Sequence, residues 1–80
     1  MQRVTPRQVR AARGLLGWKQ EDLAAKSEIS PSTIQRFEDG KGYSSKTYFQ
    51  IVETLEDHGI EFIAADESRG PGVRLRRPDL

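Results

Sequence analysis

Cysteine is absent from this 80-residue chain, and histidine occurs once, as His58. Without cysteine the chain can form neither a disulfide nor a thiolate metal site, so we expect a protein of a reducing compartment, the cytoplasm. A zinc site would need scattered carboxylates to complete it around a single histidine. The sequence therefore predicts no metal and no other cofactor.

Long apolar runs are also missing. A membrane span needs about 18 consecutive apolar residues, and the chain has no such run. No apolar segment follows the N-terminal arginines, as a signal peptide would require. Catalytic triads and phosphate-cradling glycine patterns are absent too, and the acids that cluster beside His58 suit the solvated face of a helix. We expect one small cytoplasmic protein that is not an enzyme and does not enter a membrane.

Positive and negative charges are unevenly distributed, although the net charge is only +1. Residues 1–46 carry nine Lys/Arg and five Asp/Glu, whereas residues 47–68 carry six acids and no Lys/Arg. Residues 69–80 carry four arginines and one acid. Such a distribution predicts one face for a polyanion and another face turned away from it.

Capping residues and apolar periodicity predict short helices along most of the chain. The run Thr5-Pro6-Arg7-Gln8 fits a capping box with proline at the first helical position, so a helix begins there and ends near Gly17. Acids soon after Trp18 suit the start of a second short helix. A third helix is predicted over residues 30–38, because its Ser-Pro start combines a favoured N-cap with a favoured first position.

A fourth helix and a hairpin are predicted after the third helix. Ser44 or Ser45 can cap the helix, which carries an apolar stripe. Residues 60–64 and 73–77 alternate partly between apolar and polar side chains and are separated by a polar, Gly/Pro-bearing stretch, as in a long-looped hairpin. The predicted fold is mainly α, with four to five helices at residues 1–59 and a short C-terminal β-hairpin extension at residues 60–80.

Helical spacing divides the third helix into two faces. Ile34 and Phe37 mark the buried face, whereas Ser32 and Arg36 point almost directly away, with Gln35 beside them. The outer face has no acid and is rich in groups that bind base edges: arginine suits guanine, glutamine suits adenine, and serine suits either. Two short helices in this order predict a helix-turn-helix, whose second helix enters the DNA major groove. The alternative is an ordinary solvated face in a helical hairpin that never contacts DNA.

Two charged residues fall on apolar sides of their helices. Arg13 lies on the apolar side of the first helix, and Glu38 lies toward the buried side of the third helix. Each would be costly to bury alone. We expect them to form an ion pair that locks the two helices together; the alternative is that both side chains reach water from the helix edges.

Several segments together resemble the xenobiotic-response-element (XRE) family of helix-turn-helix domains, similar to phage lambda repressor and Cro. The resemblance spans residues 5–59 and implies a compact bundle of four or five helices that binds palindromic operators as a dimer. The matching segments are Arg13, Gly17-Trp18-Lys19-Gln20-Glu21-Asp22-Leu23-Ala24, Ile29-Ser30-Pro31-Ser32-Thr33-Ile34 and Phe37-Glu38-Asp39-Gly40.

The resemblance also implies roles for individual residues. Gln20 would contact a phosphate and brace the third helix, while Thr33 and Lys41 would contact the DNA backbone. Arg13 and Glu38 match the buried ion pair of the family. Residues at the positions that meet base edges are Pro31, Ser32 and Arg36. The complete predicted DNA-binding set is Lys19, Gln20, Ser30, Pro31, Ser32, Thr33, Gln35, Arg36 and Lys41.

This chain departs from the family pattern at two positions. Lys19 stands where the family prefers a Ser or Thr cap for the second helix, which weakens the cap but adds a cation near the phosphates. Glu28 stands where the turn commonly has glycine in a left-handed conformation. That geometry costs a non-glycine residue about 1–2 kcal/mol if it is kept; otherwise the turn is altered.

The C-terminal extension resembles that of some short bacterial members of the family. We expect its apolar side chains and strand edges to pair across a two-fold axis, through Ile60, Phe62, Val73 and Leu75. The alternative is a hairpin that packs only within its own chain.

These features predict a transcriptional regulator that binds double-stranded DNA as a homodimer and represses or activates by occupying promoter DNA. A second hypothesis is a protein-interaction module, either an antitoxin or an antagonist of another regulator, that also binds its own promoter. Its partner surface would combine the acidic fourth helix with the basic tail.

Overall fold

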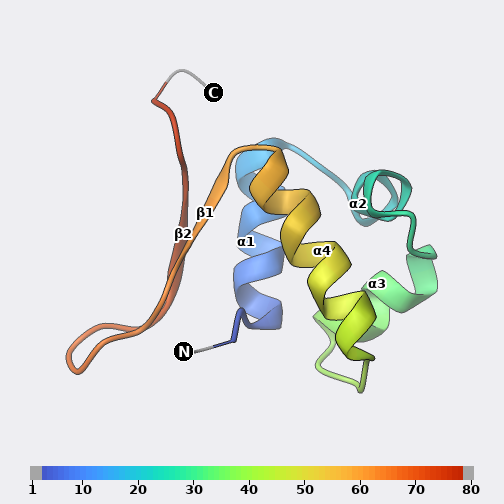
Figure 1. The fold of residues 1–80 in the computed structure, drawn as a ribbon, viewed down its shortest axis with the longest axis horizontal. Coiled ribbons are helices and arrows are strands. Elements are labelled where there is room, and N and C mark those ends of the chain that lie inside the picture. Colours follow the sequence, from blue (N-terminus) through green and yellow to red (C-terminus); the bar gives the residue numbers. More distant parts are fainter. Residues whose placement is uncertain (1–2, 79–80) are drawn as a thin grey trace.

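The computed structural model describes residues 3–78, which form helices followed by a two-stranded antiparallel hairpin (Figure 1). The helices α2 (Gln20–Ser27) and α3 (Pro31–Glu38) lie on one side of α4 (Ser45–Asp57), and the hairpin lies on the other. The mainly α fold predicted from the sequence is confirmed, with four helices in this part of the chain. The elements are α1 (Pro6–Leu16), α2 (Gln20–Ser27), α3 (Pro31–Glu38), α4 (Ser45–Asp57), β1 (Ile60–Ile63) and β2 (Gly72–Leu75).

Three of the helices begin at the caps that the sequence predicts. Thr5 and Gln8 form a reciprocal capping box, in which Gln8 Oε1 accepts from the Thr5 amide at 2.8 Å. Ser30 caps α3 and Ser44 caps α4, each by accepting from the amide three residues ahead. Helix α1 ends at Gly17, whose φ of 71° is the left-handed conformation that glycine adopts without cost.

Helix α2 begins and ends less conventionally. The Lys19 side chain has no acceptor atom and cannot cap the helix, but Asp22 Oδ2 accepts from the Lys19 amide at 2.8 Å. At the other end, Glu28 has φ 60° and ψ 36°. The turn between α2 and α3 therefore keeps its left-handed residue without a glycine, at a cost of about 1–2 kcal/mol.

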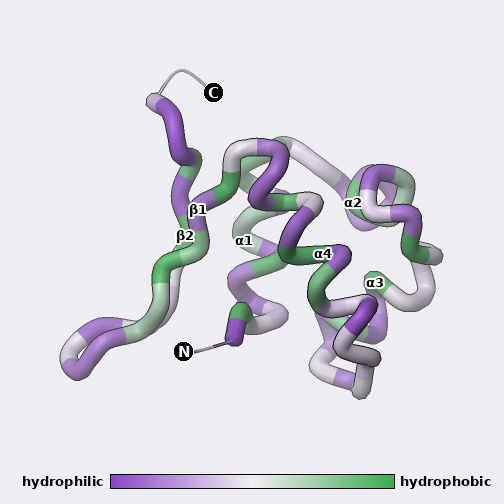
Figure 2. The backbone as a smooth tube through the Cα atoms, viewed as in Figure 1, coloured by the Kyte–Doolittle hydropathy of each residue, from purple (hydrophilic) through white to green (hydrophobic). Residues whose placement is uncertain are grey.

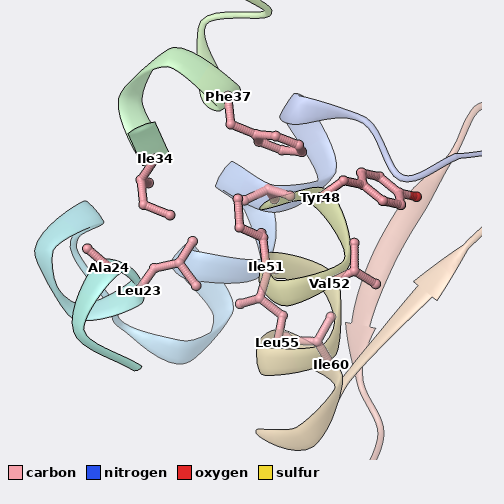
Figure 3. Packing of buried hydrophobic residues seen from close by; sticks show 11 residues of the cluster. Leu23, Ala24, Ile34, Phe37, Tyr48, Ile51, Val52, Leu55 and Ile60 are labelled. Carbon is pink, nitrogen blue, oxygen red and sulfur yellow. The ribbon is translucent and has the colours of Figure 1, made fainter. Parts of the chain in front are cut away.

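A single apolar core joins all four helices to β1. Ile34 and Phe37 point from α3 toward side chains of α2 and α4, as Figure 3 shows. Both are fully buried, as the helical spacing predicts. The core residues are Val9, Ala12, Leu23, Ala24, Ile34, Phe37, Tyr48, Ile51, Val52, Leu55 and Ile60.

The hairpin pairs β1 with β2 in an antiparallel register, with Ile60 opposite Leu75 and Ile63 opposite Gly72. The strands differ slightly from the predicted ranges 60–64 and 73–77, because Gly72 joins the ladder as the partner of Ile63 while Ala64 and residues 76–77 lie outside it. Most of the loop between the strands is hydrophilic, shown in purple in Figure 2. A loop of this composition suits solvent.

Gln8 ties the hairpin to the start of α1. Its side chain is only 5% exposed, and Nε2 donates to the carbonyl oxygens of Gly72 at 2.9 Å and Ile63 at 3.2 Å. The same side chain caps α1 through Oε1. The first turn of α1 and both strands therefore form one hydrogen-bonded unit, and the hairpin packs against its own chain.

Polar contacts on the outside of the hairpin lower the pKa of two carboxyl groups. Arg74 lies across from Glu61, with 3.1 Å between Arg74 Nη2 and Glu61 Oε2, and this hydrogen bond and charge lower the pKa of Glu61 and raise the pKa of Arg74. In the loop, the amides of Ser68 and Arg69 donate to Asp66 and lower its pKa. Both carboxyl groups are held ionised at neutral pH.

Candidate nucleic-acid interface

The helices α2 and α3 and their short turn carry most of the predicted site. The turn is compact because α3 starts at once, with Ser30 as its cap and Pro31 as its first residue. Ile34 and Phe37 fix α3 against the core. The rotation of α3 about its axis is therefore set by its buried face, and the opposite face is presented outward.

The outward face of α3 consists of exposed side chains, namely Pro31, Ser32, Gln35 and Arg36. Within residues 3–78, the side chains of Gln35 and Arg36 form no hydrogen bond or ion pair. No acid lies among these four residues, and Glu38 is turned inward with 2% exposure. The structure thus leaves an amide and a guanidinium available for hydrogen bonds with base edges.

Hydroxyl groups at the start of α3 are partly engaged in the cap. Ser30 Oγ accepts from the Thr33 amide at 3.3 Å and donates to Thr33 Oγ1 at 2.8 Å. Ser32 Oγ lies 3.3 Å from Ser30 Oγ. Thr33 is half-buried, whereas Ser30 and Ser32 are exposed. Ser30 Oγ is thereby fully engaged, because its one proton goes to Thr33 and its lone pairs face the Thr33 amide and Ser32, whereas Thr33 keeps its hydroxyl proton and Ser32 its lone pairs for a further partner.

Three predicted backbone-contacting residues lie on the flanks of α3. Lys19 stands at the start of α2 and Lys41 just after α3, and both are exposed. Gln20 is half-buried, and its Nε2 donates to Glu38 Oε1 at 3.1 Å. Gln20 therefore does brace α3, as its position implies.

The ion pair expected between Arg13 and Glu38 is present. Arg13 Nε and Nη2 each lie 2.7 Å from one carboxylate oxygen of Glu38, which makes the contact bidentate. A third nitrogen, Arg13 Nη1, donates to the Trp18 carbonyl at 3.1 Å. Because Gln20 joins the same carboxylate, α1, the α1–α2 loop, α2 and α3 meet at Glu38.

Arg10 completes this junction and was not predicted from the sequence. Its Nη1 donates to the carbonyl oxygen of Glu38, the last residue of α3. The carbonyls of Arg36 and Phe37 are bonded instead by the amides of Lys41 at 2.9 Å and Gly40 at 3.0 Å. Arg10 thus supplies a side-chain donor to a carbonyl that receives no backbone amide. Its positive charge faces the negative end of the helix dipole. Spacing along α1 could have placed Arg10 one turn before Arg13, but no sequence pattern names a carbonyl as its partner.

The four apolar hairpin residues predicted to pair across a two-fold axis have different surroundings. Ile60 is fully buried within its own chain, so it is a core residue and offers no surface to a second copy. Phe62, Val73 and Leu75 are partly buried against the same core. These three retain some exposure, and their part in a dimer stays a prediction.

The acidic side of α4 is solvated, as its sequence predicts. Glu53, Glu56, Asp57 and His58 are all exposed. The His58 ring packs edge-on against Trp18, with 4.9 Å between centroids, and its Nδ1 lies 2.7 Å from the Thr54 carbonyl. No group of three or more His, Asp or Glu side chains in residues 3–78 could hold a metal ion.

A comparison with protein families finds one described as helix-turn-helix, whose model matches residues 9–56. This match covers more than half of the 80 residues and includes α2, the turn and α3. No curated protein matches the chain. None of the helices formed by residues 3–78 is long and apolar enough to cross a membrane.

Proposed function

Because this chain belongs to the helix-turn-helix family of DNA-binding regulators, of the XRE type, we propose that it binds a palindromic operator as a homodimer. Helix α3 enters the major groove and reads base edges with Ser32, Gln35 and Arg36. The dimer occupies promoter DNA and thereby represses or activates transcription. No catalysis is involved, in keeping with the regulatory character of the family.

The outward face of α3 carries this proposal. Arg36 and Gln35 are exposed, have no partner within residues 3–78, and lie on a helix that is fixed from behind by two fully buried side chains. An arginine in this setting can bind guanine through two hydrogen bonds, and a glutamine can bind adenine. Pro31 is the exposed first residue of the helix, where it could make an apolar contact with a thymine methyl.

Phosphate contacts would come from both flanks of α3. Lys19 and Lys41 are exposed cations at the start of α2 and just after α3. The Thr33 hydroxyl and the second amide hydrogen of Gln20 supply neutral donors between them, while Ser30 acts through Thr33, which it holds in place as the cap of α3. Such contacts position the protein on any sequence and make binding dependent on salt.

The small size of the reading face supports homodimeric binding. Helix α3 has eight residues, so one copy reaches only a few base pairs. Two copies related by a two-fold axis would read inverted half-sites about 10 base pairs apart, one helical turn.

A protein-interaction role is a second candidate, because α4 presents exposed acids at residues 53, 56 and 57 while arginines at 74 and 76 are exposed on the hairpin side. An antitoxin or an antagonist of another regulator could use this surface and also bind its own promoter. Failure of the protein to bind any DNA at low salt would favour this role over the operator-binding one.

The proposal is tested by selecting bound sequences from random double-stranded DNA and then measuring the mass of the complex. The expected result is an inverted repeat occupied by two chains. Selection that enriches no motif, with binding that is equally tight on all sequences, contradicts specific readout. A motif without two-fold symmetry, bound by one chain, contradicts the homodimer while leaving readout intact.

A further inference from the structure

Phe49 is the most exposed large apolar side chain in residues 3–78, with 57% of its surface accessible. It lies on α4 beside the buried Tyr48, and its ring stands edge-on to the Tyr48 ring at 5.1 Å between centroids. Contact with a partner that covers this phenyl ring would be favourable, because it removes apolar surface from water. Helical periodicity does not place it in the core, because its neighbours Tyr48 and Ile51 already supply the buried side of α4.

A hollow lies directly beside Phe49. Its apolar floor and walls come from Val52 of α4, Phe62 of β1 and Val4 of the segment before α1. The wall formed by Val4 is fixed in place, because the Val4 amide donates to the Tyr48 hydroxyl at 2.8 Å. The same face of the molecule therefore carries a protruding ring and an apolar hollow next to it.

Charged side chains of both signs line this hollow. Arg3 is one of them, with its guanidinium 4.0 Å above the centre of the Tyr48 ring. Glu53 and Glu56 are the acids, and both are exposed. Within residues 3–78 neither carboxylate forms an ion pair. We call this surface the Phe49 groove, defined by Arg3, Val4, Phe49, Val52, Glu53, Glu56 and Phe62.

We propose that the Phe49 groove docks a second copy of this chain across a two-fold axis. Phe49 of each copy inserts into the hollow of the other, and Arg3 of each copy faces Glu53 and Glu56 of the other. This inference rests on the proposed homodimer and identifies its contact surface.

A second copy is the occupant that this surface fits best. In a two-fold contact the same patch serves on both sides, so it must be complementary to itself. The Phe49 groove meets that condition twice, since it holds both a ring and a hollow, and both a cation and two acids. A surface that bound an unrelated partner would need only the ring or the hollow, and only charges of one sign.

The predicted centre of the dimer therefore moves from the apolar hairpin residues to α4. Phe62 takes part as a wall of the hollow, whereas Val73 and Leu75 belong to β2 and do not line it. Variants of Val73 and of Phe49 thus distinguish the two surfaces.

The first experiment measures self-association without DNA by analytical ultracentrifugation over a range of concentrations. Phe49→Glu should weaken dimerisation on the order of tenfold or more, as expected for removal of a central aromatic side chain. Leu15→Glu is the matched control, because Leu15 is an exposed apolar residue of α1 with 43% exposure and does not line the groove. The control should leave dimerisation unchanged, and both variants should keep the helical circular dichroism spectrum.

A charge-reversal cycle tests the proposed contact between Arg3 of one copy and the acids of the other. Arg3→Glu should weaken the dimer, and addition of Glu53→Arg in the same chain should restore it, because the pair is then reversed in both copies. Failure of the double variant to recover contradicts the proposed facing of Arg3 and Glu53.

Two outcomes overturn the inference. One is a Phe49→Glu variant that dimerises as tightly as the natural chain. If a Val73→Glu variant then dissociates, the hairpin and not the Phe49 groove forms the dimer. The other is a natural chain that stays monomeric both free and on the selected operator. The first outcome leaves the proposed homodimer standing, whereas the second contradicts it together with the inference. Both differ from failure of DNA readout, in which the natural chain itself shows no sequence-specific DNA binding. If the inference holds, Phe49→Glu still binds a single half-site but loses cooperative binding to the full operator.

Discussion

Replacing Gln8 by glutamate sets local helix rules against the tertiary contacts of this chain. A glutamate at this position of a capping box, near the positive end of the helix dipole, is expected to be neutral or slightly stabilising. In the structure, however, Nε2 of Gln8 donates to the Gly72 and Ile63 carbonyls, and the side chain is 5% exposed. A carboxylate there would face two carbonyl oxygens and have no donor for either.

The size of the effect follows from these contacts. Gln8→Ala removes three hydrogen bonds, each with a net value of about 0.5–1.5 kcal/mol, and should cost about 2–3 kcal/mol. Gln8→Glu keeps the bond from Thr5 but places a charge among carbonyl oxygens. The variant can avoid the buried charge by taking up a proton, which costs an ordinary glutamate about 4 kcal/mol at pH 7. That cost limits the loss of stability, because the neutral acid can then donate to one of the carbonyls. We expect Gln8→Glu to lose about 3–5 kcal/mol at pH 7, more than Gln8→Ala.

Acidification should partly rescue the glutamate variant. Burial and the facing carbonyls raise the pKa of the introduced carboxyl in the folded state. A group with a raised folded pKa contributes its full stability below the unfolded pKa and loses it as the pH rises through the folded pKa. Urea unfolding followed by circular dichroism at pH 7 and near pH 5 should therefore show the gap between variant and natural chain narrowing at the lower pH. Equal stability of the two chains at pH 7 would refute the role given to Gln8.

Three further predictions concern the charged contacts. Glu38→Gln should lower the free energy of unfolding by about 3 kcal/mol, because Arg13 loses its buried partner. The double variant Glu38→Leu, Arg13→Met should recover most of that loss in the same urea assay. Arg10→Met should cost about 1 kcal/mol by removing the donor to the Glu38 carbonyl; an unchanged unfolding midpoint would mean that this bond contributes nothing. Since Arg74 lowers the pKa of Glu61, their pair stabilises above the ordinary glutamate range and is lost as the pH falls through the lowered value. Glu61→Gln should therefore flatten the acid side of the stability profile, and a profile identical to that of the natural chain speaks against the pair.

Much of the fold could be predicted from the sequence because its signals are local. A capping box, a Ser-Pro start or an apolar stripe depends on residues within one or two turns of each other. The outer face of α3 was predictable for the same reason, since Ser32 and Arg36 are four residues apart on a helix with two buried anchors. The ion pair of Arg13 and Glu38 was predictable because each charge lay on the wrong side of its helix.

The contacts that were missed connect distant parts of the chain. Gln8 was predicted as a capping residue, but its bonds to Ile63 and Gly72 join residues 55 and 64 positions apart. Arg10 contacts a backbone carbonyl, and a carbonyl leaves no mark in the sequence. Ile60 has the same apolar pattern whether it packs inward or pairs with another copy, so only the packing of β1 against α4 assigns it to the core.

The turn at Glu28 shows how tertiary structure can override local preference. Its side chain disfavours the left-handed conformation by about 1–2 kcal/mol, and the sequence left open whether the turn would change. The buried contacts of Leu23 and Ile34 on either side hold α2 against α3, and these contacts outweigh the local cost. The turn geometry is consequently kept, and with it the outward presentation of Gln35 and Arg36.

The most direct test of the central claim measures the DNA affinity of one arginine variant and one lysine variant, on a selected operator and on unrelated DNA. Arg36→Ala should weaken operator binding by about 1–3 kcal/mol and relax base preference at one position of each half-site, while binding to unrelated DNA changes little. Lys41→Ala should weaken binding to both DNAs alike and reduce the slope of log affinity against log salt by about 1. If Arg36→Ala leaves both operator affinity and base preference unchanged, α3 does not read the bases through its outward face.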